Sequence, residues 1–66
     1  MMTSTLYPQL VAILRAAGCI FIRQGKGSHE IWRSPVNRKN FSAPFTIKSK
    51  PTANAILKQA ELNVKI

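Results

Sequence analysis

The only histidine of the chain, His29, closes the segment Gly25–Lys26–Gly27–Ser28–His29. Imidazole gains and loses a proton near neutral pH, so a histidine is well suited to general acid or base catalysis. Lys26 lies within this segment, and Arg23 and Arg33 flank it. These cations would attract a phosphodiester and stabilise charge that develops on it. The alternative is a surface histidine in a basic protein, and composition alone favours that alternative.

Other residue types are compatible with chemistry, but each has a simpler structural interpretation. Gly25 and Gly27 could cradle a phosphate with backbone N–H groups, or they could form an ordinary hairpin turn. Trp32 could stack on a base or lie in the core. Cys19 is most simply a small buried residue, because nothing in the sequence brings it to His29 as a nucleophilic pair. One cysteine, one histidine and two separated acids predict neither a disulfide nor a bound metal, and no cofactor is expected.

Charge is the strongest compositional signal. Ten lysines and arginines stand against two acids, which gives a formal charge of +8. Such an excess is typical of proteins that bind polyanions. Most of the bases lie in the middle of the chain, at Arg23, Lys26, Arg33, Arg38, Lys39, Lys48 and Lys50. The residues expected to contact RNA or to stabilise transition-state charge are Arg23, Lys26, Ser28, Arg33, Lys39 and Lys48.

Periodicity predicts a helix at each end of the chain. Apolar residues at spacings of three and four predict a helix over Leu6–Ala17, with Thr5 as N-cap and Gly18 in the left-handed conformation that ends it. A second helix is expected after Thr52, its predicted N-cap. Its apolar face would consist of Ala53, Ile56, Leu57 and Ala60. The tail 63–66 is expected to be loose.

Three short segments between the helices have strand composition. They are Cys19–Arg23, Ser28–Arg33 and Lys39–Phe45, separated by turns at Gln24–Gly27 and Ser34–Asn37. Pro44 indicates that the third strand ends there or lies at an edge. The expected fold is α+β, in which a three-stranded antiparallel sheet carries two helices on one face.

Length limits the architecture to one domain, residues 1–66. A chain of this size buries only about 60% of the surface that its unfolded form exposes, which excludes large enzyme folds. No apolar stretch reaches the roughly 20 residues of a membrane helix, and residues 1–5 lack the basic start of a signal peptide. A cytoplasmic protein with no membrane contact is expected.

The segment Arg23–Trp32 resembles the HicA (YcfA-like) mRNA interferase toxins, whose motif contains Gly-Ser-His after a hydrophobic strand. Ala16–Ala17–Gly18 and Ile56–Ala60 match the same family, so the resemblance covers nearly the whole chain. It implies a double-stranded-RNA-binding-domain-like α-β-β-β-α fold. It also implies a toxin of a type II toxin–antitoxin pair that cleaves mRNA and stops growth. His29 would be catalytic, and a HicB-type antitoxin would neutralise the protein.

The sequence departs from the family at four places. Where members often carry a second histidine, in Pro-Val-His, this chain has Pro44–Phe45–Thr46. Lys50–Pro51–Thr52 replaces Lys-Pro-Gly, Ala60–Glu61–Leu62 replaces Ala-Gly-Leu, and Cys19 replaces a phenylalanine. A two-histidine mechanism within one chain is therefore excluded.

The expected function is a metal-independent endoribonuclease. The RNA 2′-hydroxyl would attack, His29 would move the proton, and Lys26 or Arg23 would stabilise the phosphorane. Water, a lysine or another protomer would take the second proton role. Two alternatives remain: a module that grips double-stranded RNA without cutting it, and a basic protein that binds an acidic protein partner.

Strand alternation places His29 with Ile31 and Arg33 on one face, and Ser28 with Glu30 and Trp32 on the other. If Ile31 belongs to the core, His29 points toward the helices. It would then be reached only because it stands at the strand end, and this arrangement is the one expected.

Overall fold

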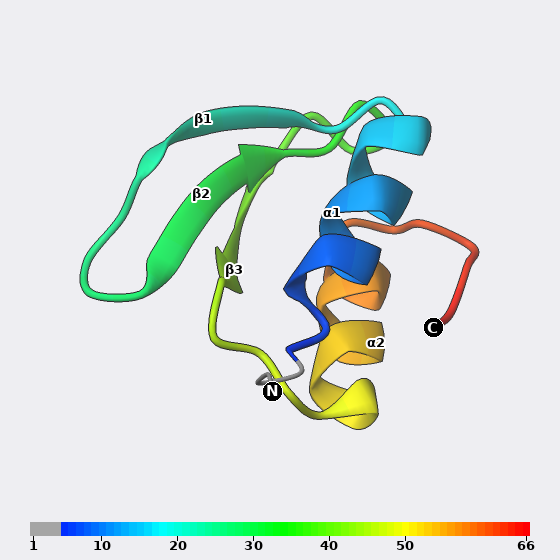
Figure 1. The fold of residues 1–66 in the computed structure, drawn as a ribbon. Helices are drawn as coiled ribbons and strands as arrows, with labels where there is room; N and C mark the ends of the chain where they lie inside the picture. Colours follow the sequence, from blue (N-terminus) through cyan, green and yellow to red (C-terminus); the bar gives the residue numbers. More distant parts are fainter. Residues whose placement is uncertain (1–4) are drawn as a thin grey trace.

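The computed structural model describes residues 5–66, which form the expected series of helix, three strands and helix (Figure 1). The elements are α1 (Tyr7–Ala16), β1 (Ile20–Gln24), β2 (His29–Arg33), β3 (Asn40–Pro44) and α2 (Lys50–Gln59). The expectation about a signal peptide concerns mainly residues 1–4, which lie outside this range.

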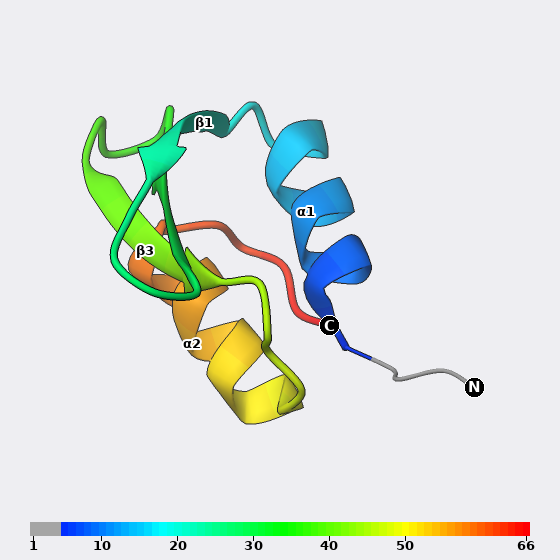
Figure 2. The same ribbon diagram turned by 60° about the vertical axis from the view of Figure 1, so that its left-hand side comes forward.

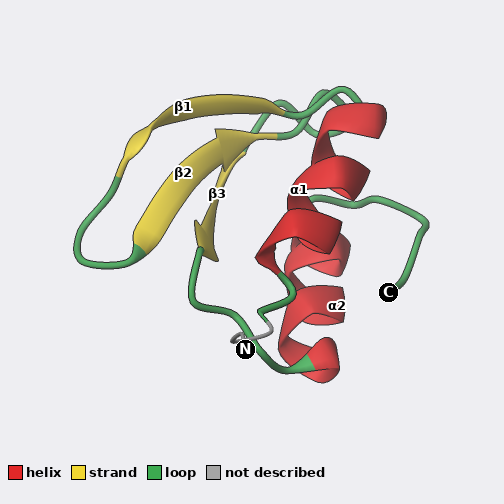
Figure 3. Ribbon diagram, in the orientation of Figure 1, coloured by secondary structure: helices red, strands yellow, loops and turns green. Residues whose placement is uncertain are grey.

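The strands form an antiparallel sheet in the order β1-β2-β3, so β2 is central. Both helices lie on one side of this sheet, as expected (Figure 3). Strand β3 is an edge strand and ends at Pro44, where the missing N–H of proline interrupts no further pairing. The β1–β2 hairpin extends beyond the helices, so its connecting loop projects from the body of the molecule (Figure 1).

The core is built around Trp32 of β2, which is 1% exposed. Phe41 and Ala43 flank it on β3, and each helix adds one apolar stripe. The stripe of α1 contains Leu10 and Leu14, and that of α2 contains Ala53, Ile56 and Leu57. The apolar face predicted for the second helix is confirmed, because Ala53, Ile56, Leu57 and Ala60 are all buried. On α1 the predicted periodicity holds for Leu10 and Leu14, which are one helical turn apart.

The start of α1 differs from the prediction. Its N-cap is Leu6, no side chain caps it, and Thr5 precedes the cap. The Leu6 N–H donates instead to the Ile47 carbonyl at 2.8 Å, so the β3–α2 connection supplies an acceptor here. At the other end Gly18 has φ +92°, and Cys19 N–H donates to the Leu14 carbonyl, which is the predicted left-handed helix stop.

The second helix starts before the predicted cap. Ser49 is the N-cap, and its hydroxyl accepts a hydrogen bond from the Thr52 N–H, so Thr52 lies inside the first turn. Pro51 fits there because the first-turn N–H groups have no helical acceptor. The C-terminal tail is not loose. Ile66 is partly buried and its N–H donates to Asn54 Oδ1 at 2.8 Å, and the tail runs between the helices (Figure 2).

Both helices within residues 5–66 are ten residues long, and neither could cross a membrane.

Candidate functional site

His29 begins β2 and its side chain lies on the outer face of the sheet, the side away from the helices. The central core residue of β2 is Trp32, so the alternation sends Glu30 inward and His29, Ile31 and Arg33 outward. The expectation that Ile31 belongs to the core was wrong. The larger Trp32 takes the position under the helices, and His29 is exposed on the open face.

A β-bulge brings Arg23 to the same face. Phe21 pairs with Trp32 and Arg23 pairs with Ile31, so Ile22 is an extra residue in β1. Without the bulge, Arg23 would share the helix-covered face with Phe21, two residues before it. The outer face therefore carries Arg23, His29 and Arg33 around Ile31. Of these, the sequence proposes Arg23 and Arg33 for contact with RNA and His29 for catalysis.

The imidazole of His29 is held by a neighbour on β3. Its Nδ1 lies 2.9 Å from Ser42 Oγ. Among residues 5–66 the ring makes no other hydrogen bond, which leaves Nε2 facing solvent. Sequence reasoning did not select Ser42. The alternation of side chains along β3 could have identified it. Ser42 lies between the buried Phe41 and Ala43, so it faces outward with His29.

The hairpin loop is closed by its own backbone. Gly25 N–H donates to the His29 carbonyl at 2.8 Å, and His29 N–H donates to the Lys26 carbonyl at 3.1 Å. Two N–H groups that could have held an anion are thus used within the loop, which favours the ordinary turn over a phosphate cradle. Gly27 has φ +61°, a conformation that suits glycine. At Gly25 a Cβ would lie 3.1 Å from the His29 carbonyl oxygen, so a side chain there would crowd the site.

The remaining predicted RNA-binding residues are more scattered. Lys26 is exposed in the projecting loop, and Ser28 is half-buried, with its carbonyl accepting from the Phe45 N–H. Lys39 is exposed just before β3, at the end of the sheet where Arg33 pairs with Asn40. Lys48 is exposed in the connection to α2. The structure thus brings Arg23 and Arg33 to the face of His29 and leaves Lys39 and Lys48 at its ends.

Glu30 faces the other way and has a structural role. Its carboxylate accepts hydrogen bonds from Tyr7 OH at 2.8 and 2.9 Å and from Trp32 Nε1 at 3.1 Å. Partial burial and the neighbouring Glu30 carboxylate raise the pKa of the Tyr7 phenol. This cluster ties α1 to β2. Because Glu30 lies on the helix side of the sheet, it provides no carboxylate partner for His29.

Cys19 lies in the core and is 4% exposed. Burial raises the pKa of its thiol, which disfavours the nucleophilic thiolate. His29 lies on the outer face of the sheet, so the two side chains do not form a catalytic pair. Within residues 5–66 there is also no cluster of three or more potential metal-ligating side chains.

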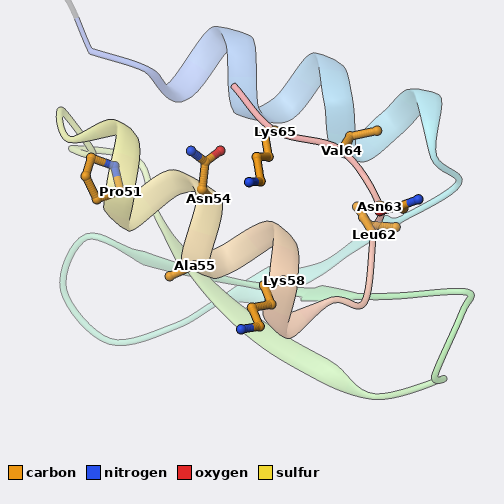
Figure 4. Close-up of a pocket in the computed structure, with 8 residues that line it drawn as sticks. All are labelled: Pro51, Asn54, Ala55, Lys58, Leu62, Asn63, Val64 and Lys65. Atoms are coloured by element: carbon orange, nitrogen blue, oxygen red, sulfur yellow. The ribbon is translucent and has the colours of Figure 1, made fainter.

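One hollow of the surface lies away from His29. It is a groove of about 470 Å³ between α2 and the C-terminal tail, and its lining includes Pro51, Asn54, Lys58, Leu62 and Lys65 (Figure 4). None of its lining residues belongs to the sheet. The groove therefore lies apart from the candidate site around His29.

The family comparison agrees with the motif around His29. The family model described as the HicA toxin of bacterial toxin-antitoxin matches residues 7–62. The chain belongs to the HicA toxin family. Comparison with curated proteins and with solved structures gives no significant match in either set. The matched region runs from the start of α1 to beyond the end of α2, so it includes both helices and all three strands of this HicA toxin. Membership of the family implies an antitoxin partner.

Proposed function

We propose that this HicA toxin is a metal-independent endoribonuclease that cleaves mRNA and thereby stops translation and growth. The observation that carries the proposal is the placement of His29 on the open outer face, with its Nδ1 on Ser42 Oγ and with Arg23 and Arg33 on the same face. A proton-transfer group thus stands among cations on a surface that a polynucleotide can reach.

The hydrogen bond to Ser42 suits both directions of proton transfer. When Nδ1–H donates to Ser42 Oγ, the lone pair is on Nε2, which can take a proton from the RNA 2′-hydroxyl. When the serine hydroxyl donates to Nδ1, Nε2 carries the proton and can give it away. Ser42 is therefore a positioning residue that keeps Nε2 toward the substrate in either tautomer.

The reaction itself is an internal transfer at phosphorus. The 2′-oxygen attacks the adjacent phosphorus as its proton passes to His29, and the bond to the 5′-oxygen breaks. The products are a 2′,3′-cyclic phosphate and a 5′-hydroxyl, so no external nucleophile is consumed. Arg23 on the outer face and Lys26 in the β1–β2 loop would stabilise the extra charge of the phosphorane. Water or a lysine would protonate the leaving oxygen, since the chain has no second histidine.

The proposed antitoxin is of the HicB type, and it inhibits by covering the outer face around His29 and the Lys26 loop. A toxin with a charge of +8 favours an acidic inhibitor, because complementary potentials steer association. Slower amide hydrogen exchange in residues 23–29 on antitoxin binding would support this arrangement. Unchanged exchange there would contradict it.

The decisive experiment is His29→Ala with Gln9→Ala as a matched control, because Gln9 is an exposed polar residue on α1. Cleavage of single-stranded RNA is measured in EDTA, together with growth arrest and melting temperature at equal soluble levels. Loss of general acid–base catalysis typically lowers the rate about 10²- to 10⁴-fold. RNA affinity and antitoxin binding should persist, and the control should behave as wild type.

Other outcomes point to the alternatives. Wild-type protein that binds RNA in EDTA without cutting it would indicate a binding module. Absence of any RNA binding would favour a basic interaction protein. Normal cleavage by His29→Ala would refute the assignment of His29, and a lowered melting temperature with full cleavage per folded molecule would give it a structural role.

A further inference from the structure

A second groove lies at the end of the sheet opposite to His29. It has a volume of about 430 Å³ and is lined by Gly18, Ile20, Arg33, Ser34, Pro35 and Arg38. Ile20 pairs with Arg33 across β1 and β2, so this groove opens beside the same outer face that carries His29. Its lining contains two arginines and no acid.

Both arginines of the groove are available to a ligand. Arg33 and Arg38 are exposed, and within residues 5–66 neither guanidinium donates a hydrogen bond to the protein or pairs with an acid. The guanidinium group binds phosphate through paired N–H donors, so two such groups in one groove favour a phosphate ligand.

The backbone at Arg38 adds an independent observation. Arg38 has φ +58°, which lies in the left-handed region. Glycine and asparagine adopt this conformation more readily than arginine does. The surrounding turn fixes this conformation. Arg38 N–H donates to the Ser34 carbonyl at 2.9 Å, and the buried Ser34 hydroxyl donates to the Ala60 carbonyl at 2.7 Å. Strained residues of this kind cluster at functional sites, because the side chain must be presented in a set direction.

We propose that the Arg33–Arg38 groove is a phosphate subsite for the RNA strand whose scissile bond lies at His29. It rests on the proposed function, because it requires an RNA substrate on the outer face. Arg33 stands four residues from His29 along β2, or about 13 Å at the rise of a strand. Stacked nucleotides at about 3.4 Å each would cover that distance in about four steps. The subsite would thus hold the backbone at a distance from the reacting phosphate.

The test measures binding of a single-stranded 2′-O-methyl oligonucleotide that is long enough to span both places. This probe lacks the 2′-hydroxyl, so its binding does not depend on cleavage. The variant is Arg38→Gly, which removes the guanidinium and also relieves the backbone. One phosphate contact on a single strand contributes about 0.7 to the salt slope, which corresponds to about fivefold in affinity at 0.1 M salt. We expect Arg38→Gly to lower both the salt slope and the affinity for the long probe by these amounts. Its melting temperature should be equal to or above that of wild type.

A matched control makes the result specific. Lys58→Ala removes one charge from α2, in the groove on the other side of the molecule, and should leave the salt slope unchanged.

Two results would overturn the subsite: unchanged affinity and salt slope for Arg38→Gly on the long probe, or an equal loss for Lys58→Ala. Each would leave the proposed ribonuclease function intact if wild-type protein still binds and cleaves RNA. Failure of wild type to bind the long probe at all would overturn both proposals, and normal cleavage by His29→Ala would overturn only the catalytic one.

Discussion

Replacing Glu61 by glycine should stabilise this toxin. Glu61 follows the last turn of α2 with φ +59°, and the helix closes through Glu61 N–H to Lys58 and Leu62 N–H to Leu57. This closing motif requires the left-handed conformation at its centre. The family pattern Ala-Gly-Leu has glycine at that point, whereas this chain has Ala60–Glu61–Leu62. A residue with a Cβ costs roughly 1–2 kcal/mol in this conformation.

Two terms oppose the gain. Glycine loses more backbone freedom on folding, which costs about 0.5–1 kcal/mol. The substitution also removes the exposed hydrogen bond from Asn37 Nδ2 to Glu61 Oε2 at 3.2 Å. Comparison with Glu61→Ala cancels this second term, because alanine lacks the carboxylate and keeps the Cβ. The glycine variant should therefore exceed the alanine variant in the free energy of unfolding by about 0.5–1 kcal/mol.

The size of the melting shift follows from the length of the chain. An unfolding entropy of about 2.1 cal/mol/K per residue amounts to about 0.14 kcal/mol/K for 66 residues. The expected difference in Tm is thus about 4–7 °C. Reversible thermal melts by circular dichroism at one pH and salt concentration measure it, and both variants carry the same net charge. A glycine variant that melts at or below the alanine variant would refute the reasoning, because the backbone at position 61 would then carry no cost.

The remaining predictions concern the loop and the α1–β2 contact. Gly25→Ala should lower cleavage per folded molecule more than it lowers RNA affinity, because its Cβ would lie 3.1 Å from the His29 carbonyl oxygen. Single-turnover cleavage rates and RNA-binding curves measure the two effects separately. Unchanged cleavage rates would contradict this prediction, because they would show that the loop accommodates the added methyl group. Tyr7→Phe should lower stability at pH 8, and the gap to wild type should narrow above pH 10. The pKa of Tyr7 is raised above its ordinary 10.0, so its bond to Glu30 stabilises the fold below that pH and is lost as the phenol ionises. Urea midpoints from pH 8 to 11 measure this, and a constant gap would count against it.

Much of the fold follows from local patterns. Apolar spacing predicts both helices, glycine at position 18 predicts the end of the first, and Pro44 predicts the end of the last strand. These signals are short-range, since each depends on a residue's own backbone preference or on neighbours within one turn. The N-caps of both helices were predicted wrongly. At α1 the Leu6 N–H finds its acceptor at Ile47, a residue far away in sequence, whereas at α2 the cap is Ser49, three residues before the predicted Thr52.

The tail was misjudged for a related reason. Its residues carry no periodic pattern, and a loose end was therefore expected. Ile66 nevertheless packs against the core and its N–H bonds to Asn54, a contact that exists only once α2 is in place.

The composition of the site could be predicted from the sequence, but its arrangement could not. His29 and its surrounding cations form a recognisable motif, and that motif led to the family that the comparison shows. Ser42 was missed because its partnership with His29 depends on the pairing of β2 with β3, and Arg38 was not selected because its groove requires the end of the sheet to meet the Ser34–Lys39 turn.

The sequence by itself determined the order of the elements, the excess of positive charge and the motif that ends in His29. Only the tertiary structure decided which face of the sheet His29 occupies. Alternation along a strand defines two faces without saying which one the helices cover, and here burial of Trp32 decided it. The bulge at Ile22 then turned Arg23 to the same side. Both choices arise from long-range packing and pairing, which leave no local signal in the chain.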